Sequence, residues 1–164
     1  MLGPFAAAAL FLICVLSGAA LKEVFAIETR ETAALVNDLN AVQTWVRLER
    51  ITAPELVKRL SDDAGASELW RNAQTKLERG EALHTALTAA ADELIIPKNA
   101  KAELKRCFGA FGNSDSETEL KRLGGTIERL EAIKAELAAE NARKTKLVSA
   151  LSVPIGLALA LAAL

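Results

Sequence analysis

The sequence predicts an all-α protein, with a bundle of about six helices between an N-terminal and a C-terminal transmembrane helix. Three observations carry this prediction. Apolar residues between positions 22 and 146 recur every three or four residues, and Ser or Thr capping signals separate the runs. No segment alternates apolar and polar residues as a strand does, and no Asn-Gly or Asp-Gly hairpin turn occurs. Both ends of the chain are apolar and uncharged. The predicted domains are residues 1–21, residues 22–146 and residues 147–164.

The two ends are predicted to cross a membrane. All 20 basic and 21 acidic residues lie between Lys22 and Lys146. At about 1.5 Å per helical residue, the stretch 147–164 measures roughly 27 Å, close to the hydrocarbon thickness of a bilayer. Positive charge at Lys22 and near Lys146 places the middle of the chain in the cytoplasm. Two alternatives stay open: a buried C-terminal helix of a globular core, and a cleaved leader at residues 1–21, for which Ser17-Gly18-Ala19-Ala20 offers a small-residue exit.

The central domain begins with a long helix at residues 22–50. One face of this helix carries apolar side chains at helical spacing, namely Leu35, Leu39, Val42 and Val46, and Trp45 and Leu48 widen that face. Thr52 and Glu55 form a predicted capping box with Pro54 in the first turn, which opens a short helix that ends at Gly65.

Three more short helices follow. Ser67 is placed to cap the third helix, which Gly80 closes. A fourth covers residues 81–94, and Pro97 separates it from a fifth at residues 98–108.

The last helix is predicted to start at a second capping box, formed by Ser114 and Glu117, and to run into the C-terminal span. Its apolar residues form a coiled-coil-like seam that faces the first long helix, in antiparallel order: Leu120, Leu123, Ile127, Leu130 and Leu137. Gly124-Gly125 weakens this helix, and either close helix approach or a hinge explains the pair.

The composition argues against several functional classes. A formal charge of −1 and an isoelectric point near 5.9 speak against a nucleic-acid partner. His84 is the single histidine, and neither cysteine has a partner at metal-ligand spacing, so neither a metal nor another cofactor is expected. The sequence also contains no nucleotide-binding loop and no Gly-x-Ser-x-Gly elbow, and we therefore expect a noncatalytic protein.

The segment Phe108-Gly109-Ala110-Phe111-Gly112-Asn113-Ser114-Asp115, followed by a leucine-rich helix, basic residues and an apolar end, resembles the stage III sporulation protein AB family. The first long helix and the Thr52-Ala53-Pro54-Glu55-Leu56 segment fit the same family. The resemblance implies a membrane-bound part of the secretion-like channel complex between mother cell and forespore. It also implies a fold similar to the cytoplasmic domains of the type II secretion inner-membrane platform protein.

By the same resemblance, the expected partners are the lipid bilayer, the ATPase stage III sporulation protein AA and other membrane proteins of the complex. The expected location is the mother-cell membrane around the forespore, with the helical domain in the cytoplasm. From the residues alone, a small membrane-bound sensor or scaffold with a ligand- or partner-binding helical domain remains an alternative. The candidate partner-binding residues, which can equally form the joint of the bundle, are Phe108, Gly109, Phe111, Gly112, Ser114 and Asp115.

Overall fold

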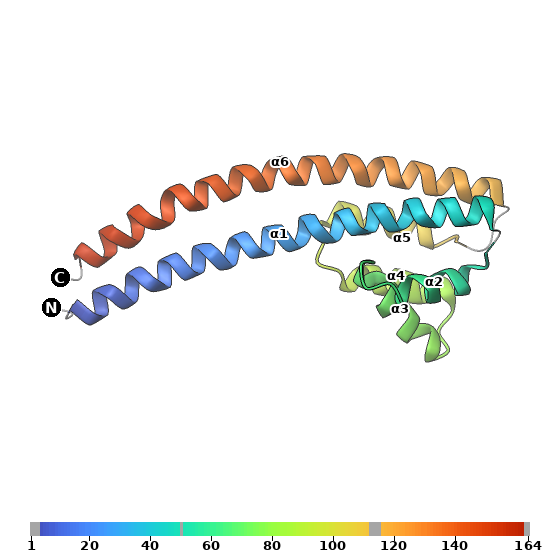
Figure 1. Ribbon diagram of the computed structural model, residues 1–164, viewed down its shortest axis with the longest axis horizontal. Helices are drawn as coiled ribbons and strands as arrows, with labels where there is room; N and C mark the ends of the chain where they lie inside the picture. Colours follow the sequence, from blue (N-terminus) through green and yellow to red (C-terminus); the bar gives the residue numbers. More distant parts are fainter. Residues whose placement is uncertain (1–3, 50, 112–115, 163–164) are drawn as a thin grey trace. The chain divides into compact units, whose positions relative to one another are not determined.

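The computed structural model describes residues 4–49, 51–111 and 116–162, and within them it contains six α-helices and no strand (Figure 1). The predicted all-α class is therefore confirmed for this part of the chain. The helices are α1 (Pro4–Leu48), α2 (Ala53–Ser61), α3 (Glu68–Glu78), α4 (Leu83–Glu93), α5 (Lys98–Phe108) and α6 (Ser116–Ala162). The chain divides into two compact units, Glu28–Ala135 and the pair Met1–Ile27 with Glu136–Leu164.

The unit Glu28–Ala135 holds the hydrophobic core. Each short helix packs on the next, α2 on α3, α3 on α4 and α4 on α5. All six helices contribute to the largest fully buried side chains, among which are Trp70, Phe108, Leu35, Leu39, Leu56, Leu60, Leu69, Leu87, Leu104, Leu123 and Leu130. Trp70 meets the edge of Phe108, with ring centroids 6.1 Å apart. The predicted apolar faces of the helices therefore meet in one core.

Local signals set several helix ends. The Ser67 hydroxyl accepts a hydrogen bond from the N–H of Leu69 at 3.2 Å, as expected of the residue that caps α3. Gly80 follows α3 with φ +87°, a left-handed conformation that glycine adopts without strain. The fifth helix has the predicted bounds, and the fourth is shorter than the predicted 81–94.

Further details of the prediction were wrong. The second helix ends at Ser61, four residues before the predicted end at Gly65. Thr52 precedes α2, but its side chain makes no capping hydrogen bond. Pro54 lies in the first turn, where its missing N–H removes one of the donors that such a cap would satisfy. Leu48 is 74% exposed. It lies two residues after Val46, which turns its side chain to the opposite side of the helix.

In this unit α1 and α6 run antiparallel (Figure 1). They approach closely at Gly124, where an added Cβ would lie 3.2 Å from Nε2 of Gln43. The same Nε2 donates a hydrogen bond to the Leu120 carbonyl at 3.3 Å. Close helix approach therefore explains Gly124.

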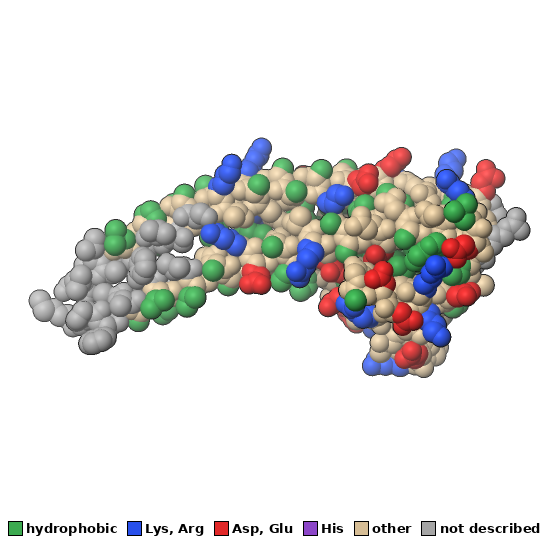
Figure 2. All heavy atoms as spheres, in the orientation of Figure 1, with side chains coloured by type: hydrophobic (Ala, Val, Ile, Leu, Met, Phe, Trp, Pro, Cys, Tyr) green, Lys and Arg blue, Asp and Glu red, His purple; other side chains and the backbone are tan. Residues whose placement is uncertain are grey.

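The other unit consists of the first part of α1 and the last part of α6. Nδ2 of Asn141 donates to the Phe25 carbonyl at 3.1 Å, and the Lys144 ammonium lies 5.5 Å from the centre of the Phe25 ring. Figure 2 shows hydrophobic side chains on the surface of both helices. The side chains that are at least half exposed include Leu12, Ile13, Leu16, Leu147, Leu151 and Leu157. Within the described residues, no helical stretch is both long and apolar enough to span a bilayer.

Candidate functional site

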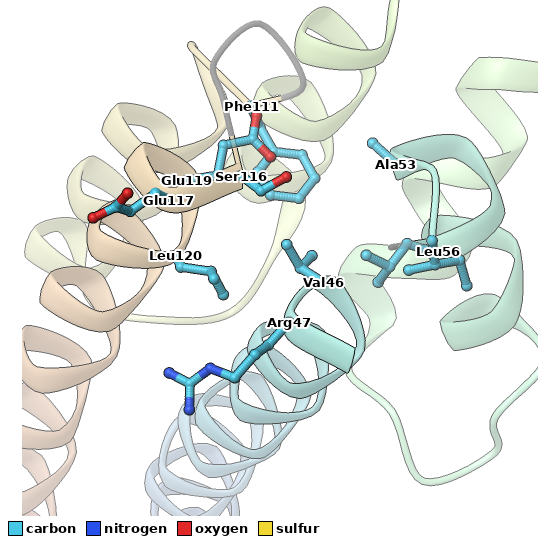
Figure 3. A pocket seen from close by; sticks show the side chains of 10 residues that line it. Val46, Arg47, Ala53, Leu56, Phe111, Ser116, Glu117, Glu119 and Leu120 are labelled. Atoms are coloured by element: carbon cyan, nitrogen blue, oxygen red, sulfur yellow. The ribbon is translucent and has the colours of Figure 1, made fainter. Parts of the chain in front are cut away.

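The candidate site is a pocket of about 450 Å³ in the unit Glu28–Ala135 (Figure 3). The last turn of α1 supplies Val46 and Arg47 to its wall, and the start of α6 supplies Glu117 and Leu120. The remaining lining residues come from the start of α2, the segment before it, the turn after α5 and α6 itself: Ile51, Ala53, Leu56, Phe111, Ser116 and Glu119. The pocket therefore collects side chains from segments that are far apart in the sequence.

Apolar side chains form the interior of this pocket. In Figure 3, Val46 lies between Leu120 of α6 and Leu56 of α2, with Phe111 beside them. Leu56 and Phe111 are nearly fully buried, whereas Val46 and Leu120 are half-buried and can still lose surface to a partner. The site can thus receive an apolar side chain from outside.

Charged side chains surround this apolar interior. Arg47 is exposed on α1, and Glu117 and Glu119 lie in the first turn of α6. Carboxylates at that position are stabilised by the positive end of the helix dipole. Both signs of charge line the same pocket as the apolar side chains, a combination that is also found at protein-binding surfaces.

The sequence-predicted site residues divide into two sets. Phe108, Gly109 and Phe111 are described, whereas Gly112, Ser114 and Asp115 lie outside the described residues. Phe108 is fully buried, and its ring meets the edge of Phe111 at 6.2 Å between centroids. Phe111 is the only one of the described three that also lines the pocket.

Gly109 ends α5 and allows the turn that carries Phe111. Its N–H donates to the Lys105 carbonyl at 2.9 Å, and an added Cβ would lie 3.1 Å from that same oxygen. The Phe111 N–H then donates to the Phe108 carbonyl at 3.1 Å. These contacts favour a structural role for Phe108 and Gly109, in the turn that joins α5 to the rest of the bundle. The same turn places Phe111 in the wall of the pocket.

A buried carboxylate, which the sequence interpretation did not identify, ties α3 to α1. Oδ2 of Asp38 accepts hydrogen bonds from the Ser67 N–H at 2.9 Å and from Nε1 of Trp70 at 2.8 Å. Glu31 lies seven residues, or about two turns, before Asp38 on α1. Its Oε1 accepts hydrogen bonds from the Ser67 hydroxyl at 2.6 Å and from the Glu68 N–H at 3.0 Å. The two carboxylates satisfy the first donors of α3, which a helix leaves without partners inside itself.

The pKa of the Asp38 carboxyl is raised, mainly because burial disfavours its charged form. The negative charges of Asp63 and Glu31 also raise this pKa, whereas the hydrogen bonds from Ser67 and Trp70 lower it. The signal was present in the sequence, because Asp38 lies three residues after Leu35 and four before Val42, on the buried face of α1. An acidic residue on an apolar face requires a buried donor.

Catalytic chemistry has no support at the described positions. No group of three or more His, Cys, Asp or Glu side chains among them could hold a metal ion. His84 is exposed and its ring nitrogen meets the hydroxyl of Thr85 at 3.3 Å. Cys107 is buried, and desolvation raises the pKa of its thiol, the opposite of what a nucleophilic cysteine needs.

Comparison with known families gives one result. The family model described as stage III sporulation protein AB matches residues 5–163, nearly the whole chain. No curated protein and no solved structure shows significant similarity to this chain.

Proposed function

The chain belongs to the stage III sporulation protein AB family, and from that premise we propose that it is a noncatalytic, membrane-anchored part of the channel complex between mother cell and forespore. In this role its helical unit Glu28–Ala135 docks the cytoplasmic ATPase, stage III sporulation protein AA. The family supports a function in stage III of sporulation. The docking function rests on one observation, the apolar pocket with a charged rim at the ends of α1 and α6.

The pocket suits a docking protein because of the helices that form it. Val46 and Arg47 belong to α1, and Glu117 and Leu120 belong to α6. These are the two long helices that continue into the apolar ends of the chain. A partner bound at the pocket would therefore contact both helices that lead to the proposed anchors.

The pocket also favours docking over the binding of a small ligand. It is partly open to solvent, and charged and polar side chains line it beside the apolar ones. A small-molecule site encloses most of the ligand surface and directs its few polar groups inward. We accordingly rank the sensor function below the scaffold function.

Membrane anchoring is the second part of the proposal. Residues 1–21 and 147–164 contain no acidic or basic residue, and their described apolar side chains are largely exposed. Exposed apolar surface of this extent requires a cover, and a bilayer would provide it at both ends. Lys22 and the basic residues up to Lys146 would then lie on the cytoplasmic side.

The anchoring is tested by cysteine accessibility in intact cells. A Cys14→Ser variant that carries Lys98→Cys, at an exposed position of α5, is treated with a membrane-impermeant maleimide. Cys107 is buried and should contribute no background. Labelling only after lysis is the expected outcome. Labelling in intact cells would reverse the orientation and remove the ATPase as a partner.

The docking is tested with the purified full chain in detergent and the purified ATPase. Arg47→Glu and Leu120→Asp change the rim and the interior of the pocket, and each should weaken binding by about tenfold or more, the loss typical of an interface hot spot. Arg79→Glu, at the end of α3 and outside the pocket, makes the same charge change as a control. Equal binding by all three variants would place the ATPase elsewhere. Circular dichroism checks that Leu120→Asp remains folded.

A further inference from the structure

A second surface feature lies between α5 and α6, apart from the pocket described above. It is a groove of about 240 Å³ centred on Gly125. Cys107 and Thr126, both almost fully buried, form its floor. Its other lining residues are all basic, namely Arg106, Lys121, Arg122 and Arg129.

Among the residues that the structure describes, none packs closely enough on Gly125 to require a glycine there. An added Cβ would meet only the Arg129 guanidinium at 3.8 Å, an ordinary contact. At Gly124, by contrast, the added Cβ would come within 3.2 Å of Gln43. A glycine inside a helix costs about 1 kcal/mol relative to alanine. Since the fold does not require Gly125, the open space that it leaves is available to another molecule.

Contacts within the chain compensate part of the positive charge of the groove, and Arg122 has partners of its own. One carboxylate, that of Glu103, pairs with both Arg106 and Arg129, at 3.2 Å from Nη1 of the latter. Arg122 donates to the Ala110 carbonyl at 3.0 Å. Lys121 is exposed and forms no ion pair with the residues that the structure describes.

Two further carboxylates lie near the groove without lining it. Glu128 lines the adjoining hollow on α6, together with Lys121 and Arg129, and Glu119 lies in the first turn of α6. The charged side chains that line the groove itself are all basic, which favours an anion.

We propose that this groove docks an acidic helical segment of a partner protein. A Glu or Asp side chain of that segment enters between Lys121 and the arginines, and the backbone of the partner helix approaches α6 over Gly125. Charge complementarity supports the carboxylate, and the unneeded glycine supports a closely packed helix.

A protein segment fits better than an extended polyanion. The chain as a whole has a formal charge of −1, so it has no long-range attraction for nucleic acid. The groove is large enough for one or two carboxylates, and the adjoining hollow adds Glu128 and no further basic residue, which does not suit a phosphate backbone. This surface is independent of the proposed ATPase pocket and can be tested apart from it.

The test uses the full chain in its native cells, with a photo-activated benzophenone amino acid in place of Glu128, which is exposed beside the groove. Mass spectrometry identifies the cross-linked peptide. We expect a peptide of another protein, rich in Asp or Glu. Cross-linking to lipid, to a second copy of this chain or to a peptide without acidic residues would overturn the proposal, and so would the absence of any cross-link.

Two substitutions test the mechanism of docking. Lys121→Glu should reduce the cross-link yield by about tenfold, the effect of one charge-assisted hydrogen bond. Gly125→Leu should also reduce the yield, because its side chain would fill the space over which the partner helix approaches α6. Lys98→Glu makes the same charge change on an exposed residue of α5 outside the groove and should leave the yield unchanged.

Two controls address the folding of the variants and the identity of the partner residue. Gly125→Leu should keep or raise the Tm, because leucine favours the helix, so reduced cross-linking in that variant cannot come from unfolding. Reversing the acidic residue of the identified partner to lysine should restore its cross-link to Lys121→Glu. Equal yields for Lys121→Glu and Lys98→Glu would refute the role of charge.

Discussion

The replacement of Asp38 by alanine should destabilise the helical unit more than the loss of a typical surface carboxylate would. Asp38 accepts from the Ser67 N–H and from Nε1 of Trp70, both in buried hydrogen bonds. Asp38→Ala leaves two buried donors without this acceptor, at a cost of about 1–3 kcal/mol each. The variant also removes the desolvation penalty that raises the pKa of the carboxyl. We therefore expect a net loss of about 2–4 kcal/mol.

A matched variant separates the hydrogen bonds from the charge. In Asp38→Asn the amide oxygen can still accept from Ser67 and Trp70, and the buried charge is gone. Its stability should lie within about 1 kcal/mol of the parent. Because whole domains are stable by only about 5–15 kcal/mol, the two variants should be clearly distinguishable.

The assay is urea unfolding of the full chain in detergent at pH 7, followed by Trp70 fluorescence in a Trp45→Phe background. Trp70 is buried and hydrogen-bonded to Asp38, so its emission reports directly on this contact. If Asp38→Ala unfolds at the same urea concentration as the parent, the contact does not stabilise the unit. If Asp38→Asn is as damaging as Asp38→Ala, the charge rather than the pair of hydrogen bonds is what matters.

The buried groups lead to three more predictions. Because the pKa of Asp38 is raised in the folded state, that state holds the proton more tightly than the unfolded state does. Stability should therefore fall as pH rises from the ordinary aspartate pKa through the raised one. Urea midpoints measured across this pH range should show the fall, and Asp38→Asn should reduce it. Cys107 is buried with a raised thiol pKa, and it should react with a maleimide at pH 7.5 only after denaturant is added; rapid reaction in the native chain would contradict its burial. Phe108→Ala should cost about 3–5 kcal/mol through the cavity that it leaves, measured by thermal unfolding against Phe108→Leu, which should cost less.

Much of the fold could be predicted because its signals are local. Ser67 at the start of α3, Gly80 after its end and Pro97 before α5 act on their own turn of the chain, and the structure places helix ends at all three. The apolar periodicity of α1 and α6 likewise identified buried residues such as Leu39 and Leu123.

The features that the sequence did not reveal depend on contacts between distant segments. Asp38 stands visibly on an apolar face, but its donor Trp70 lies 32 residues away. The roles of the glycine pair of α6 likewise depend on segments distant in sequence, because Gly124 faces Gln43 of α1 and Gly125 faces the groove beside α5. Adjacent identical residues acquire different roles once α6 has neighbours on two sides, and periodicity alone cannot separate them.

The candidate site could be predicted only in part for the same reason. The interpretation of the sequence directed attention to the turn after α5, and Phe111 does reach the pocket. The larger part of the wall comes from the end of α1 and the starts of α2 and α6, whose proximity no local pattern indicates.

The position of Asp38 on α1 links the core to the proposed docking pocket. Asp38 and Val46 lie on the same helix, eight residues or about two turns apart, so the hydrogen bonds that hold α3 also fix the turns of α1 leading to the pocket. Glu31, about two turns before Asp38 on α1, adds a second hydrogen-bonded contact to the start of α3. A partner bound at Val46 or Arg47 would therefore contact a helix that is held against α3 by hydrogen bonds to two of its carboxylates. For the proposed docking function such a fixed helix would be useful, and the hydrogen bonds that fix it need an acceptor such as a carboxylate at position 38, which an apolar residue could not replace.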